Sequence, residues 1–288
     1  MRSTTSPPGP PWATMITLAV ALAGPACEGN DSLPPDRDPF SELPPEALEC
    51  TPNLDGRIDA TEIVTAFGLE VSYLVSPSGT TRDIDVRGDD ESGVTVWDWS
   101  VDLADDQIAR LGPEPLDGKW YEEFFEPDSF VAPFDGGGSI ETISRQTEEG
   151  LFLLGLASAE ENPAEGKTLL IYDAPVLLLK FPIEPGSSFT SVGTVDNATF
   201  RGIPYAATDT YEVSVDAVGE LRLPSFTFTQ AHRIRTDLTV EPALGDPASV
   251  RQVSYFFECF GEIARATSQP NEPNANFTTA AQVRRLGF

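Results

Sequence analysis

The chain has few of the residues that carry out most enzymatic chemistry. Its 288 residues include one histidine, His232, and three cysteines. It contains no G-x-S-x-G, H-E-x-x-H, C-x-x-C or phosphate-cradling glycine motif. His232 lies on the apolar side of a predicted strand, where we expect a hydrogen-bonded core histidine. The sequence therefore predicts a noncatalytic protein. A carboxylate-dependent hydrolase is the enzymatic alternative, because an acidic chain offers many pairs of carboxylates.

Basic residues are also scarce. The chain has 18 Lys and Arg against 46 Asp and Glu, which gives a formal net charge of −28. Such a charge repels the phosphates of nucleic acids and the headgroups of anionic lipids. We therefore expect no nucleic-acid partner, and membrane attachment has to come from a lipid rather than from a basic patch. The same acidity favours solubility and the binding of divalent cations.

The apolar run near the N-terminus is too short to span a membrane. It covers residues 12–22, follows a single charged residue, Arg2, and is followed by small residues before Cys27. This order of a positive charge, an apolar run and small residues is typical of an export signal. We therefore predict a signal peptide over residues 1–26.

Residues 23–26, Ala-Gly-Pro-Ala, precede Cys27 and resemble the lipobox of bacterial lipoproteins, in which the cysteine becomes the acylated first residue. Gly24 stands where that motif usually carries leucine. The resemblance implies lipidation of Cys27 and a place in the bacterial cell envelope, as an outer-membrane lipoprotein. Ordinary cleavage after Ala26 is the alternative. Residues 27–49 contain repeated Pro together with Asn, Asp, Ser and Gly and few large apolar residues, a composition that predicts a flexible tether.

Two cysteines remain when Cys27 is set aside. Cys50 and Cys259 form an even pair, and exported proteins fold in an oxidising compartment. We therefore predict a disulfide between them. It would join the start of the folded domain to its last strands and stabilise it by about 3–5 kcal/mol in the chain-entropy model.

Residues 51–62 resemble the calcium loop of EF-hands and dockerins. The residues that would ligate the ion are, in order, Asn53, Asp55, Arg57 through its carbonyl, Asp59 and Glu62. Thr51 stands where the first acidic ligand is expected. The resemblance implies a calcium-stabilised structural or adhesion module. The alternative is a short helix that is capped by Asp59, has Glu62 as its capping-box partner, and ends near Gly68.

Residues 211–217, 226–240 and 253–259 each alternate apolar with polar side chains, which is typical of half-buried strands. The apolar faces that we predict are Tyr211, Val213, Val215 and Ala217; then Phe226, Phe228, Ile234, Leu238 and Val240; and then Val253, Tyr255, Phe257 and Cys259. Val218-Gly219 and Pro224-Ser225 interrupt the pattern, and each break predicts a turn or a bulge.

The rest of the chain extends this pattern with short apolar runs and turns rich in Pro and Gly. We expect short helices over residues 59–68 and 102–111, and an acidic loop over residues 88–93. Aromatic residues within 119–134 are expected to fill the core, with a lid or a partner surface as the alternative. The sequence thus predicts one all-β or β-dominated α+β domain over residues 50–288. We expect a curved antiparallel sheet, an open barrel or a sandwich.

The spacing of Pro, Gly and apolar residues over 176–189 and 219–234 is similar to that of β-rich exported bacterial lipoproteins of uncharacterised function. The resemblance implies a curved sheet or open barrel, as in lipoprotein carriers, and it brings no catalytic residue. We expect a lipid-anchored, noncatalytic envelope protein that binds an apolar ligand or another envelope protein. The calcium-stabilised module and the carboxylate-dependent hydrolase remain alternatives.

Overall fold

The computed structural model describes residues 50–63, 67, 70–134 and 137–288. All of these belong to one compact unit. The predicted signal peptide, Cys27 and the predicted tether lie outside the described residues. In the part of the chain that is described, no helix is both long and apolar enough to cross a membrane.

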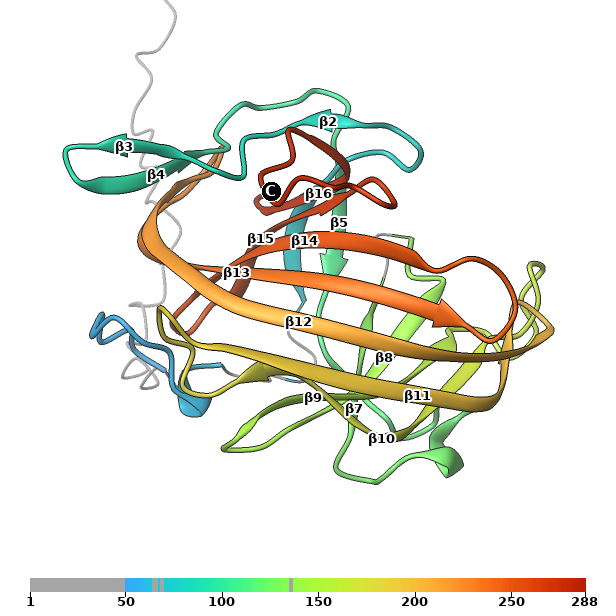
Figure 1. Ribbon diagram of the computed structural model, residues 1–288. Coiled ribbons are helices and arrows are strands. Elements are labelled where there is room, and N and C mark those ends of the chain that lie inside the picture. The colour runs from blue at the N-terminus through green and yellow to red at the C-terminus, as the bar shows by residue number, and fades with distance from the viewer. Residues whose placement is uncertain (1–49, 64–66, 68–69, 135–136) are drawn as a thin grey trace, which may run out of the picture. The chain divides into compact units, whose positions relative to one another are not determined.

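The described residues form a single large sheet (Figure 1). Its main path runs β5-β1-β16-β15-β14-β13-β12-β11-β10-β9-β8-β7-β6, with β2 paired to β16 and the β3–β4 hairpin paired to β12. The strands are β1 (Val71–Val75), β2 (Arg82–Asp83), β3 (Asp89–Glu91), β4 (Val94–Asp98), β5 (Gln107–Leu111), β6 (Glu114–Pro115), β7 (Phe130–Pro133), β8 (Ile140–Gln146), β9 (Gly150–Ser158), β10 (Leu169–Lys180), β11 (Ser188–Phe200), β12 (Ile203–Arg222), β13 (Thr227–Pro242), β14 (Ala248–Phe257), β15 (Gly261–Ser268) and β16 (Thr279–Leu286). Neighbouring strands are antiparallel, except that β4 and β12 are parallel.

The two edge strands of the main path, β5 and β6, follow one another in the chain. Only Gly112 and Pro113 lie between them. Three peptide units span at most about 11 Å, so the two edges of the sheet come close together. A flat sheet of this many strands would hold its edges far apart. The sheet is therefore curved but not closed into a barrel, which confirms the predicted β-dominated fold with a curved antiparallel sheet.

Helical structure in the described residues is limited to two 3₁₀ segments, Ala60–Glu62 and Glu122–Phe124. The first begins after Asp59, as predicted; residues 64–66 and 68–69, which the predicted helix also covers, lie outside the description. The helix predicted over residues 102–111 is wrong. Residues 107–111 form β5, which pairs along its whole length with β1. Backbone pairing at the sheet edge overrides a helix-like sequence pattern.

The acidic loop predicted over residues 88–93 is only partly a loop. Asp89–Glu91 forms β3, which pairs with β4 around a turn at Ser92 and Gly93. Both of these turn residues have positive φ, 58° and 88°. This is the backbone that a two-residue hairpin turn requires.

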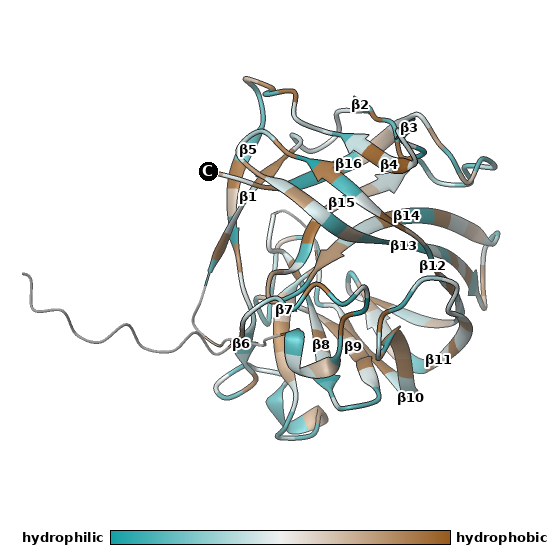
Figure 2. Cartoon of the chain, turned by 90° about the vertical axis from the view of Figure 1, so that its left-hand side faces the viewer, coloured by the Kyte–Doolittle hydropathy of each residue, from teal (hydrophilic) through white to brown (hydrophobic). Residues whose placement is uncertain are grey.

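Alternate residues of β14 belong to different cores. Val253, Tyr255 and Phe257 pack into one apolar cluster, and Phe256 packs into another. Side chains of a strand point alternately to its two faces, so these clusters lie on opposite faces of β14. Figure 2 shows hydrophobic and hydrophilic residues alternating along β13 and β14. A third cluster, around the fully buried Tyr121, confirms that part of the aromatic passage fills the core.

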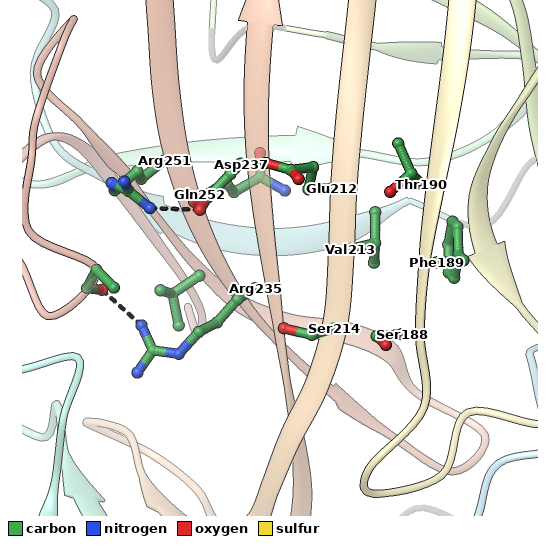
Figure 3. A pocket seen from close by; sticks show the side chains of 12 residues that line it. Ser188, Phe189, Thr190, Glu212, Val213, Ser214, Arg235, Asp237, Arg251 and Gln252 are labelled. Carbon is green, nitrogen blue, oxygen red and sulfur yellow. Dashed lines mark hydrogen bonds and ion pairs between the residues drawn. The ribbon is translucent and has the colours of Figure 1, made fainter.

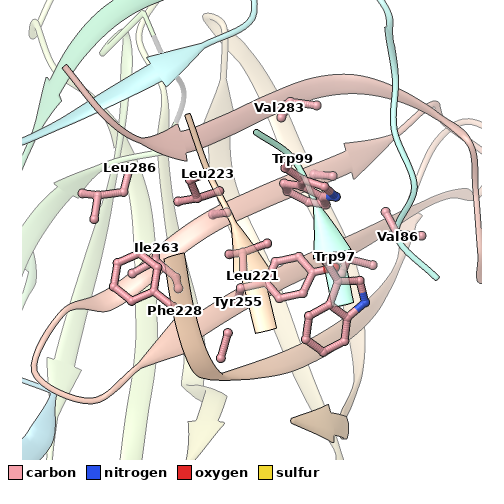
Figure 4. Close-up of a cluster of buried hydrophobic side chains, with 14 of the residues drawn as sticks. Val86, Trp97, Trp99, Leu221, Leu223, Phe228, Tyr255, Ile263, Val283 and Leu286 are labelled. Atoms are coloured by element: carbon pink, nitrogen blue, oxygen red, sulfur yellow. The ribbon is translucent and has the colours of Figure 1, made fainter. Parts of the chain in front are cut away.

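The β3–β4 hairpin covers the first of these clusters. Parallel pairing of β4 with the end of β12 holds Trp97 and Trp99 over the ring of Tyr255. The ring centroids lie 4.8 Å and 4.9 Å from that of Tyr255, and both indoles are almost completely buried (Figure 4). The apolar face of β14 is thus covered by a lid made from the N-terminal half of the chain.

A bulge moves β12 from one cluster to the other. Tyr211, Val213 and Val215 lie in one apolar cluster, as the alternation predicts, but Ala217 packs against the opposite one. The register with β13 shifts between Val215 and Ala217, which places one extra residue on β12 and reverses its inward face. The prediction that Ala217 shares the face of Val215 is therefore wrong.

The neighbouring strand β13 divides in the same way. Phe228, and Phe226 just before the strand begins, pack with the cluster covered by the tryptophans, whereas Ile234 and Leu238 pack with the opposite one. A second register shift, between Gly219 and Leu221 on β12, accompanies this change of face. Val218 and Gly219 stay in register with His232 and Ala231, so the irregularity predicted at Val218-Gly219 lies on either side of these two residues. The single apolar face predicted for residues 226–240 is wrong.

Candidate functional site

The segment that precedes β1 is bonded to segments much later in the chain, near Ile183 and Cys259. The predicted disulfide is present: the Cα atoms of Cys50 and Cys259 are 5.5 Å apart, with an S–S distance of 2.02 Å. Ile58 and Ile183 exchange backbone hydrogen bonds of 2.9 Å and 2.8 Å. The prediction that Cys259 shares a strand face with Phe257 is wrong. β14 ends at Phe257, and Cys259 lies in the following turn with φ 67°.

The residues predicted to bind calcium come together in this segment, but they bond to one another. Glu62 is buried, and its Oε1 accepts a 2.7 Å hydrogen bond from Asn53 Nδ2. Its Oε2 accepts a 2.8 Å hydrogen bond from the backbone N–H of Asp59. The second bond is the Glu62 half of the capping box that was the alternative interpretation of this sequence. Both oxygens of the predicted bidentate ligand are therefore occupied.

The remaining acids of the loop pair with its arginine. The Arg57 guanidinium lies 3.7 Å from Asp55 Oδ2 and 3.1 Å from Asp59 Oδ2. Asp55 also accepts a hydrogen bond from the Arg57 backbone N–H. Among the described residues, no group of three or more His, Cys, Asp or Glu side chains is placed to hold a metal ion. Calcium could bind here only by displacing the hydrogen bonds of Glu62 and the ion pairs of Arg57.

Glu258, which was not predicted, holds the loop of residues 51–62 through its carboxylate. It is 1% exposed, and its Oε2 accepts hydrogen bonds of 2.6 Å and 2.8 Å from the backbone N–H groups of Asn53 and Leu54. Leu54 has φ 56°, which turns consecutive N–H groups toward one point, the arrangement that binds anions. Two N–H groups of the loop thus donate to a carboxylate of the chain itself. A charged residue directly after the apolar run Tyr-Phe-Phe was the available signal.

His232 lies beneath the same loop and is fully buried, as predicted for a core histidine. Its Nδ1 is 3.1 Å from the carbonyl oxygen of Gln230, and its Nε2 is 3.0 Å from that of Gly56. Both ring nitrogens are therefore engaged by the backbone. This arrangement holds the loop against β13 and leaves no ring nitrogen open to a substrate.

A groove of about 670 Å³ lies on the polar face of β11–β14 (Figure 3). Cross-strand register builds it from two rows of side chains. One row is Thr190, Glu212, Asp237 and Arg251, and the other is Ser188, Ser214, Arg235 and Val253. Ala275, in the segment between β15 and β16, completes the lining. Sequence analysis did not find this site, because its residues are spread over positions 188–275.

The charges of the groove are not all compensated. Arg251 pairs with Asp237, and its Nε donates a 2.8 Å hydrogen bond to the Glu272 carbonyl. Arg235 pairs with Asp216 at 2.6 Å and also donates to the Ala275 carbonyl. Glu212 is exposed, and no residue in the described part of the chain bonds to its carboxylate.

Glu212 lies directly opposite Asp237 on the neighbouring strand. Like charges in that position destabilise a sheet. The groove therefore presents one uncompensated carboxylate among hydroxyl groups and fixed arginines.

A second group of titratable side chains lies inside the core. The Tyr172 hydroxyl donates a 2.6 Å hydrogen bond to Asp209 Oδ2 and lies 3.5 Å from the Tyr211 hydroxyl. Asp209 Oδ1 is buried and has no hydrogen-bond partner among the described residues. Burial raises the pKa of the Asp209 carboxyl, although the bond from Tyr172 acts in the opposite direction. Burial also raises the pKa of Tyr211 to about 12.

This buried group contains one carboxyl and two phenols. Hydrolysis by paired carboxylates needs two acids that face each other across a substrate. The described surroundings of Asp209 supply no second acid, and Tyr172 and Tyr211 close it off from solvent. The arrangement is that of a buried polar cluster in a core.

Comparison with family models, with curated proteins and with solved structures gives no match to this chain.

Proposed function

We propose that this chain is a noncatalytic protein of the bacterial cell envelope, anchored through an acylated Cys27, that binds another envelope protein in the groove over β11–β14. The observation that carries the binding proposal is the groove itself, with the uncompensated carboxylate of Glu212 beside Asp237. A partner that places a basic side chain there would remove the like-charge repulsion between these two residues.

The lining of the groove favours a protein partner over an apolar ligand. Eight of its 12 lining residues are polar or charged, whereas sites for apolar ligands are lined mainly by apolar and aromatic side chains. Phe189 and Val213 contribute to the lining, but their side chains pack into the apolar cluster on the opposite face. An extended segment or loop of a protein, with hydroxyl, amide and basic groups, matches such a surface.

The fixed geometry of the arginines supports recognition rather than catalysis. Arg235 uses Nε, Nη1 and Nη2 in hydrogen bonds to Asp216, Ala275 and Asn276. A guanidinium held in this way is already ordered, so a partner that contacts it causes little further loss of side-chain entropy. The described part of the groove contains no histidine, cysteine or lysine that could act as a nucleophile or proton carrier.

The binding proposal is tested by photo-crosslinking in cells that produce the full chain. A benzophenone side chain replaces Thr190 in the groove, and Thr229, exposed on β13 outside the groove, is the matched control. We expect a protein adduct from position 190 that is absent from position 229 and is weakened by Glu212→Lys. An adduct of equal yield from both positions, or an adduct with lipid alone, would contradict binding in the groove.

The anchoring proposal is tested separately, so that either proposal can fail alone. Mass spectrometry of the mature N-terminus is expected to show an acylated Cys27. The variant Cys27→Ala is expected to leave the membrane fraction. A mature chain that begins at an unmodified Cys27 would show that ordinary signal-peptide cleavage occurs instead.

A further inference from the structure

Three large apolar side chains are exposed at one end of the long strands. Phe200, Ile203 and Leu244 are 40%, 67% and 94% exposed, and we call them the tip patch. Phe200 and Ile203 are direct cross-strand partners at the end of the β11–β12 hairpin. The turn between β13 and β14, which carries Leu244, lies at the same end of these strands (Figure 1).

Strand register brings the members of the tip patch together. Ala207 pairs with Pro242, and the backbone N–H of Ala243 donates a 2.8 Å hydrogen bond to the carbonyl of Ala206. Leu244 is the next residue, so it lies beside the end of β12 where Ile203 begins that strand. The patch is therefore formed by two turns that lie at the same end of adjacent strands.

The Phe200 ring packs against that of Tyr205, with 5.5 Å between the ring centroids, but folding does not account for the exposed side chains of Ile203 and Leu244. The β11–β12 turn is made by Arg201 and Gly202, with φ values of 49° and 77°, which are the conformations that such a two-residue turn needs. None of the three tip residues is a member of a buried apolar cluster. Adjacent apolar side chains left in water are unfavourable, and surfaces of this kind mark contact sites.

The residues around the tip patch are mainly acidic. The β9–β10 loop, whose Lys167 carbonyl accepts a hydrogen bond from the Gly202 N–H, borders the patch. Exposed acids of this loop and of the β13–β14 turn are Glu160, Glu161, Glu165, Glu241 and Asp246. Against these five acids stand two basic residues, Lys167 and Arg201, and Lys167 is already paired with Glu161 at 3.5 Å. The patch is an apolar centre with a negative rim.

We propose that the tip patch docks into an apolar socket of a partner protein, and that the socket is bordered by Lys and Arg. An apolar centre within a polar rim is the usual build of a protein interface, and opposite charges at the rim bring such partners together. A second copy of this chain would set its acidic rim against another acidic rim, and an anionic bilayer would repel it in the same way. The groove over β11–β14 is a different surface, and this proposal does not depend on it.

The experiment uses the full chain with a benzophenone side chain in place of Leu244, irradiated in the producing cells. The crosslinked protein is identified by mass spectrometry and purified, and its affinity for the unmodified chain is then measured. We expect Leu244→Ser and Ile203→Ser each to weaken that affinity by about tenfold or more, because side chains at an interface centre dominate binding. Affinity is also expected to fall as salt is raised.

Val192→Ser is the matched control, because Val192 is 53% exposed on β11 but lies away from the turns. It should leave the affinity unchanged. Thermal melting of each variant verifies its fold, and since Leu244 is almost fully exposed, the Leu244→Ser variant keeps the test valid if Ile203→Ser is unstable. Adducts with lipid alone or with a second copy alone, the absence of an adduct, or a partner whose affinity neither variant changes would each overturn the proposal.

Discussion

Leu54 donates its backbone N–H to the carboxylate of Glu258 over 2.8 Å, across 204 positions of sequence. The same oxygen accepts the N–H of Asn53. This contact, together with the neighbouring disulfide, attaches the start of the folded unit to the turn between β14 and β15. A loop that resembles a cation site is held in place by an anion that belongs to the chain itself.

Replacement of Glu258 by alanine is expected to destabilise the fold by about 1–3 kcal/mol, because two backbone donors lose their acceptor in a buried place. Urea unfolding followed by tryptophan fluorescence measures the change. Glu184→Ala, at an exposed position, is the control and should change stability by less than about 0.5 kcal/mol. Equal unfolding midpoints for the two variants would show that the Glu258 contact contributes nothing.

Removal of the disulfide is expected to cost about 3–5 kcal/mol, because it closes a loop with a sequence separation of 209 residues. The double variant Cys50→Ser, Cys259→Ser avoids an unpaired thiol and is compared with the parent chain in urea. A reducing agent should lower the midpoint of the parent and leave the double variant unchanged. Free thiols at both positions in exported protein, measured by mass spectrometry, would refute the bond.

The buried carboxyl of Asp209 predicts a pH dependence of stability. Its pKa in the folded protein is raised above the ordinary value of 3.8, chiefly by burial. From pH 3.8 up to that raised pKa, the folded protein binds more protons at this site than the unfolded chain does. The contribution of Asp209 to stability is therefore present below pH 3.8 and is lost as pH rises through its folded pKa.

Asp209→Asn removes this titration, so we expect the variant to gain stability relative to the parent as pH rises from 3.8. Urea unfolding at a series of pH values measures the difference. Asp196→Asn, at an exposed position of β11, is the matched control and should track the parent. A constant difference between Asp209→Asn and the parent across the pH series would contradict a raised pKa.

Calcium at millimolar concentration is expected to leave the melting temperature unchanged. To bind at the loop it would have to break both hydrogen bonds of Glu62 and separate Arg57 from Asp55 and Asp59. Melting with and without calcium, with magnesium as the control ion, tests this expectation. A calcium-specific rise that Glu62→Gln abolishes would establish the calcium-stabilised module instead.

The local features of the fold were predictable from the sequence. Alternation of apolar and polar side chains indicates a strand, and Gly and Pro indicate turns, so the strands around Tyr211 and Val253 were predicted. The disulfide followed from counting cysteines. The helix predicted over residues 102–111 was wrong, because the helix preference of a short segment contributes less free energy than the backbone hydrogen bonds between β1 and β5.

The sequence by itself determined the strands around Tyr211 and Val253 and, with Cys27 set aside, which two cysteines join. Only the tertiary structure decided that Ala217 faces away from Val215, that the Glu258 carboxylate accepts the N–H groups of Asn53 and Leu54, and that Glu212 and Asp237 meet in a groove. The physical reason is the distance over which each effect acts. Alternation and turn chemistry act between neighbours in the chain, whereas register, bulges and charge pairs depend on which distant strands lie side by side.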